Sequence, residues 1–74
     1  MSRTTWDGLD EAIIGATTKG QVVYDVELII QELMKMHKDW DRQDALEWFY
    51  HNIDGAYIGE NTPIHMYRVE DEEE

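Results

Sequence analysis

Two central segments carry hydrophobic residues at the three- and four-residue steps of an amphipathic helix. In the first segment, these positions lie on one face: Val26, Ile29, Ile30, Leu33, Met34 and His37. In the second segment, the corresponding positions are Leu46, Phe49, Tyr50 and Ile53. Asp25 precedes the first segment and Asp41 begins the second, and a carboxylate at such a position caps free backbone amides of the first turn. The pattern therefore predicts two capped helices, over residues 26–37 and 41–53, each with one buried face.

Three shorter segments have the composition of strands. Residues 11–18 are rich in β-branched and small side chains, and residues 21–24 follow after a Lys-Gly pair. Gly20 adopts positive φ at no steric cost, so the two segments predict a β-hairpin. Gly15 indicates either a bulge in the first strand or the close approach of another backbone. Residues 64–67 alternate like a final strand.

The predicted order of elements is β-β-α-α-β, which corresponds to an α+β fold. We expect a three-stranded antiparallel sheet with the two helices packed on one face. The last strand is expected to pair with the first, which would place residues 11–18 in the centre. Because apolar residues extend from Leu9 to Tyr67 without an internal linker, residues 1–69 are predicted to form a single domain. Residues 70–74 are all acidic and are expected to be a disordered tail.

The chain is strongly acidic, and the charge is unevenly placed. Its 17 Asp and Glu residues outnumber 6 Lys and Arg residues, giving a net charge of −11. The tail accounts for five of these negative charges and leaves −6 on residues 1–69. Such a charge argues against direct binding to nucleic-acid phosphates or to an anionic membrane. The lack of cysteine and of a signal-like apolar N-terminus favours the cytoplasm.

Residues that carry catalysis or hold cofactors are sparse. His37, His51 and His65 lie on three different predicted elements and lack the spacing of a metal-binding motif. Ser2 is the only serine and lies at the terminus, so no Ser-His-Asp arrangement is expected. We therefore predict a protein that is not an enzyme and has no metal or cofactor. A metal held across elements by His65 with a carboxylate stays open as an alternative.

Acidic residues are concentrated where the second helix begins. Residues 39–47 contain four acids with Arg42 as the only base among them: Asp39, Asp41, Asp44 and Glu47. Capping and the helix dipole explain part of this group. Together with three acids near the N-terminus, the group is predicted to form a negative, partner-binding surface: Asp7, Asp10 and Glu11. Trp40 and Trp48 are predicted anchors of the contact. The alternatives are an ordinary solvated face and tryptophans that close the ends of a small core.

Three sequence strings carry a resemblance to a known group of proteins. They are LDEAIIG at residues 9–15, GQVVYD at residues 20–25 and NIDGAYIGENTPI at residues 52–64. Together they resemble a group of small tailed-phage and prophage proteins of unassigned function, with the glycine-rich third string the most specific. The resemblance covers residues 9–66 and implies an accessory protein, encoded by a phage, that acts in the cytoplasm of a bacterial host. It brings no catalytic residues.

The small size and the negative charge allow a comparison with a functional class of phage proteins. Small acidic phage proteins resemble inhibitors that imitate nucleic acid, such as anti-CRISPR proteins and glycosylase inhibitors. The leading hypothesis is therefore a protein that binds and inhibits a bacterial nucleic-acid-binding or defence protein through its acidic surface. The alternative is a structural phage protein that self-associates as a homodimer through apolar and aromatic side chains.

Overall fold

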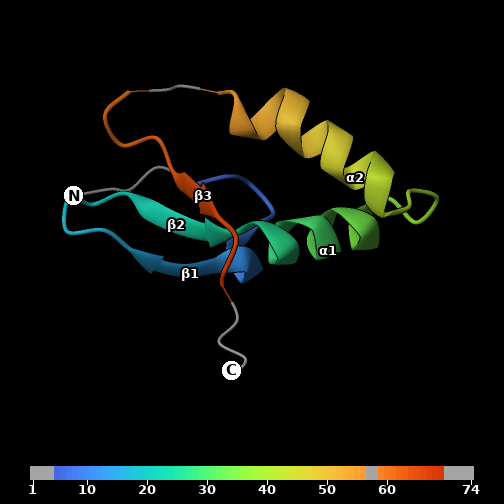
Figure 1. Ribbon diagram of the computed structural model, residues 1–74, viewed down its shortest axis with the longest axis horizontal. Coiled ribbons are helices and arrows are strands. Elements are labelled where there is room, and N and C mark those ends of the chain that lie inside the picture. The colour runs from blue at the N-terminus through green and yellow to red at the C-terminus, as the bar shows by residue number, and fades with distance from the viewer. Residues whose placement is uncertain (1–4, 57–58, 70–74) are drawn as a thin grey trace.

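The computed structural model describes residues 5–56 and 59–69. It is a mixed α+β fold (Figure 1), as predicted. The elements are, in chain order, η1 (Asp10–Ala12), β1 (Ile13–Ala16), β2 (Val22–Asp25), α1 (Val26–Met36), α2 (Arg42–Phe49), η2 (Tyr50–Asp54) and β3 (Ile64–Met66). The predicted acidic tail at residues 70–74 lies outside the described residues, as do residues 57–58.

The hairpin near the N-terminus is confirmed. β1 runs antiparallel to β2, and Gly20 lies in the connecting turn with a φ of 90°, which costs glycine little. The register shifts between Ile13 and Gly15, which is the kind of irregularity that the first of the two interpretations of Gly15 predicts. β1 is shorter than expected because residues 10–12 form a 3-10 turn, η1, in front of it.

Both helices begin at the aspartates predicted to cap them. The side chain of Asp25 accepts a hydrogen bond from the backbone N–H of Glu27, 2.8 Å away. At α2, Asp41 and Asp44 form a reciprocal capping box, in which each side chain accepts from the other residue's backbone N–H. The second helix ends as a π-helical turn, η2. This turn begins at Tyr50, and that residue, predicted on the buried stripe, is exposed.

The predicted strand order and the all-antiparallel sheet are wrong. The order is β1-β2-β3, with β2 in the centre and β3 parallel to it. A parallel neighbour requires a long crossover connection, and the two helices supply it. In Figure 1, α1 leaves the end of β2 and α2 runs back alongside α1. Residues 59–63 lie beside the start of β2, where the amide of Gln21 donates to the carbonyl of Thr62 over 3.1 Å.

The buried side chains come from every helix and from the sheet. They form one cluster: Leu9, Ala12, Val22, Tyr24, Val26, Ile29, Ile30, Leu33, Ala45, Phe49 and Ile53. β1 lies at the edge of the sheet, and Ile14, Gly15 and Ala16 are exposed. An edge strand of this kind is open to pairing with a strand of another chain.

An ion pair joins the segment after β3 to the last residue of β2, which precedes α1. The carboxylate of Asp25 is 2% exposed and, besides capping α1, accepts a hydrogen bond from the guanidinium of Arg68. Arg68 follows β3, so this contact joins two segments that are 43 residues apart in the sequence. It therefore helps to hold β3 in its parallel position next to β2.

Candidate functional site

Five of the predicted partner-binding residues line one open groove on the surface. We call it the acidic groove, and its volume is about 570 Å³. The five are Asp39, Trp40, Asp44, Glu47 and Trp48, and His51 and Asn52 complete the lining. The structure thus brings three of the four acids of residues 39–47 together with both predicted tryptophan anchors.

Helix geometry explains most of this grouping. Asp44, Glu47, Trp48 and His51 follow one another at the spacing i, i+3, i+4 and i+7, which places them on one face of the helical segment. Asp39 and Trp40 come from the connection between α1 and α2, immediately before this helix begins. The groove therefore lies along one side of α2 and ends at its N-terminus.

An aromatic row runs beside the carboxylates. The rings of His37 and Trp40 are stacked with centroids 3.9 Å apart, and Trp40 lies 6.1 Å from Trp48 at an angle of 45°. His37, predicted on the buried face of the first helix, is exposed because it lies just beyond the last residue of α1. Trp48 is 38% exposed. The row leaves its indole available to a partner.

The only base within residues 39–47 does not neutralise the groove. The guanidinium of Arg42 turns towards α1 and forms two hydrogen bonds of 2.6 Å with the carboxylate of Glu27. These contacts lower the pKa of Glu27. Inside the groove, Glu47 accepts one hydrogen bond from the neutral amide of Gln43 over 3.3 Å. Arg42 is therefore not among the side chains that line the groove with these carboxylates.

The remaining predicted acids occupy other positions. Asp41 does not line the groove, and its carboxylate accepts the backbone N–H of Asp44 as the cap of α2. Asp7 lines a neighbouring hollow that shares Trp48 with the acidic groove. Asp10 and Glu11, on η1, line neither. Of the three N-terminal acids, the structure thus brings only Asp7 next to the groove.

The side chain of His65 contacts three other parts of the chain. Its side chain is 5% exposed, and its Nε2 accepts a hydrogen bond of 2.8 Å from the indole of Trp6. An indole only donates, so the ring proton is on Nδ1, which lies 3.4 Å from a carboxylate oxygen of Asp54. The ring also meets the edge of Phe49. Burial lowers the pKa of His65 more than Asp54 raises it.

These contacts of His65 predict that the folded protein loses stability in acid. In the unfolded chain His65 takes up a proton near pH 6.5, whereas the folded protein resists protonation because Nε2 faces a donor. The free energy of unfolding is therefore expected to fall as the pH decreases below about 6.5. The slope for this one proton is at most about 1.4 kcal/mol per pH unit. Urea titrations between about pH 7.5 and pH 5 measure it.

The His65→Gln variant removes the titrating group and keeps an amide that both donates and accepts. Its stability should change less over this pH range than that of the unmodified protein. The matched control is His51→Gln, because His51 is exposed. It should reduce the pH dependence less than the His65→Gln variant does. Equal pH dependence in the His65→Gln variant and the unmodified protein would contradict the prediction.

No family model, curated protein or solved structure matches the chain.

In residues 5–56 and 59–69, no three His, Asp or Glu side chains are grouped so that they could hold a metal ion. In the same part of the chain, no helix has the length and apolar content needed to cross a membrane. The pair of His65 with Asp54 is thus the closest approach to the metal site left open by the sequence.

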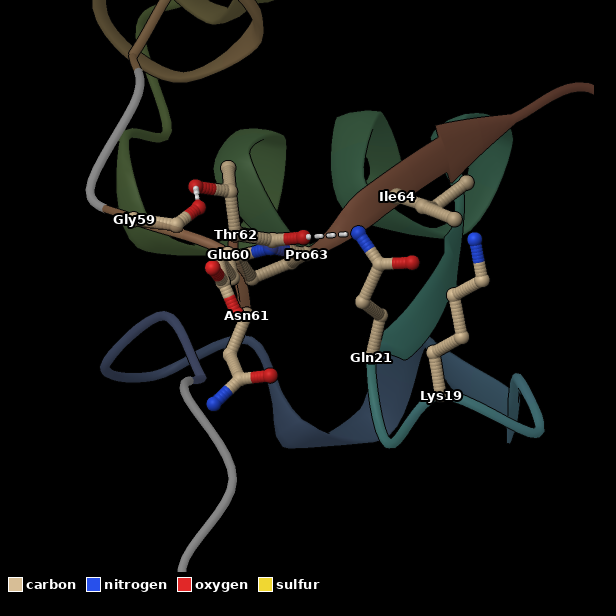
Figure 2. Close-up of a pocket in the computed structure, with 8 residues that line it drawn as sticks. All are labelled: Lys19, Gln21, Gly59, Glu60, Asn61, Thr62, Pro63 and Ile64. Carbon is tan, nitrogen blue, oxygen red and sulfur yellow. Dashed lines mark hydrogen bonds between the residues drawn. The ribbon is translucent and has the colours of Figure 1, made fainter.

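A hollow larger than the acidic groove lies beside the start of β2 (Figure 2). Its volume is about 800 Å³, and its walls are the turn after β1 and residues 59–64. Figure 2 shows the amide of Gln21 directed at the carbonyl of Thr62 and Lys19 extending beside Ile64. Among the described residues that line it, Lys19 and Glu60 carry charge. Because these charges are opposite, the lining gives no preference for a charged ligand.

Proposed function

We propose that this protein is a non-enzymatic binding protein whose acidic groove docks on a basic protein surface. The target is a bacterial nucleic-acid-binding or defence protein, which the bound protein inhibits in the host cytoplasm by occupying the surface that otherwise contacts nucleic acid. The observation that carries the proposal is the grouping of Asp39, Asp44 and Glu47 around Trp40 and Trp48.

The chemistry of the groove fits arginine and lysine side chains. Carboxylates accept charge-assisted hydrogen bonds from guanidinium and ammonium groups, as phosphate oxygens do. The face of a tryptophan attracts the same cations, and more strongly where water is excluded. A surface that binds phosphates therefore presents the groups that this groove can bind.

The excess negative charge supports the same partner class. With a net charge of −11, the protein is attracted to a basic surface before contact, which raises the association rate. The attraction is screened by salt, since the Debye length is about 8 Å at physiological ionic strength. The resemblance to small phage proteins agrees with a bacterial target.

Charge reversal in the groove is the direct test. The double variant Asp39→Lys with Glu47→Lys changes two exposed acids that cap no helix. We expect its affinity for the partner captured from a bacterial lysate to fall at least about tenfold, which corresponds to 1.4 kcal/mol. Titration calorimetry with the purified partner measures the change. Short duplex DNA should displace the protein, because both would occupy one surface.

The matched control has the same change in net charge at another place. Asp10→Lys with Glu11→Lys reverses two exposed acids on η1, outside the groove. It should weaken binding much less than the groove variant. Equal losses in the two double variants would show that only net charge matters and would contradict docking through the groove. Simultaneous binding of DNA and this protein to the partner would contradict the inhibitory role.

A further inference from the structure

The hollow that Asp7 lines opens next to the acidic groove, and we call it the apolar slot. Its volume is about 250 Å³. Three buried side chains lie at its floor, namely Leu9, Leu33 and Ile53. Its more exposed lining comes from the N-terminal segment, the end of α1, α2 and η2: Trp6, Asp7, Met36, His37, Trp48 and Asn52.

We infer that the apolar slot receives one large apolar side chain of the protein partner. The partner's contact segment is then basic with a single aliphatic or aromatic anchor, rather than basic throughout. This inference rests on the proposed function, because the same partner fills the acidic groove.

The slot and the groove form one continuous surface. Trp48 and Asn52 line both hollows, so a segment lying across Trp48 reaches both. Asp7 then lies at the anchor, and the carboxylates of Asp39, Asp44 and Glu47 lie in the adjoining groove. Interfaces typically concentrate binding energy in such an apolar centre with a polar rim.

The size of the slot favours a side chain over a small-molecule ligand. Ligand pockets usually measure about 300–1,000 Å³, whereas the slot measures about 250 Å³. Met36 at its edge is 48% exposed. Its terminal methyl lies 3.1 Å from the position that a Cβ on Gly8 would occupy. A methionine adapts its shape readily, so the slot can accommodate anchors of different shape.

Two synthetic peptides test the inference. Both contain eight lysines around one central residue, which is leucine in the first and serine in the second. We expect the leucine peptide to bind about tenfold more tightly, since burying a leucine side chain favours binding. NMR titration at low salt measures both affinities, and the Met36 methyl and Trp48 indole signals should shift with the leucine peptide.

The variant Met36→Glu separates the slot from general charge attraction. It adds a negative charge but places a carboxylate at the slot, so it should abolish the advantage of the leucine peptide. The matched control Met66→Glu adds the same charge on β3, where the methionine is also exposed, and should keep that advantage. If the charge alone determined binding, both variants would bind both peptides more tightly.

The outcomes distinguish the two proposals. A tenfold preference for leucine that Met36→Glu removes supports the apolar slot. Equal binding of both peptides, weakened by Asp39→Lys with Glu47→Lys, overturns the slot and leaves the proposed function standing. No binding of either peptide at low salt overturns both.

Discussion

Replacing Phe49 by alanine is expected to remove a large share of the free energy that stabilises the fold. Phe49 is fully buried at the end of α2, and its ring meets His65 of β3 edge-on at 5.2 Å. Removing a buried phenylalanine side chain typically costs about 3–5 kcal/mol. A domain of this length has about 4–11 kcal/mol of stability in total. Urea titration followed by far-ultraviolet circular dichroism measures the loss.

The neighbouring residue provides the matched control. Trp48→Ala removes a larger side chain, but that side chain is partly exposed and lies at the groove. It should cost clearly less stability than Phe49→Ala, while it weakens partner binding. Comparable destabilisation by the two variants would show that Trp48 is a core residue rather than part of a binding surface.

The second large effect concerns the ion pair between Asp25 and Arg68. The variant Arg68→Met leaves a carboxylate that is 2% exposed and that keeps, among the contacts of residues 5–56 and 59–69, its capping hydrogen bond from Glu27. Breaking a fully buried pair costs about 3–5 kcal/mol. Because the Arg68 side chain is 60% exposed, solvent screens this pair, and we expect a loss of about 2 kcal/mol. Thermal or urea unfolding measures it.

Two further variants isolate the buried charge as the cause. Arg42→Met breaks the other arginine pair, which lies at the surface with Glu27, and should change stability little. Adding Asp25→Asn to Arg68→Met removes the buried charge while asparagine still caps α1, so it should restore part of the lost stability. No recovery in this double variant would mean that the loss came from other contacts of Arg68.

The prediction of the site rested on the spacing of residues along one helix. Spacing shows which side chains share a face, but it does not show contacts between different elements. Asp44, Glu47 and Trp48 are within one helical turn of one another, so their common face follows from the sequence. The same spacing could not show that Arg42 turns away towards Glu27, since that contact lies between two helices. No sequence pattern predicted the apolar slot, because its lining residues, such as Trp6, Met36 and Ile53, are far apart in the chain.

The sequence by itself determined the elements of this fold that depend on neighbours along the chain. Both helix caps and the turn at Gly20 are set by backbone geometry within a few residues. Only the tertiary structure decided the strand order and the parallel direction of β3. These depend on contacts between distant residues, such as Gln21 with Thr62 and Asp25 with Arg68. Such pairs leave no periodic pattern, because they meet only after the two helices have returned the chain to the start of β2.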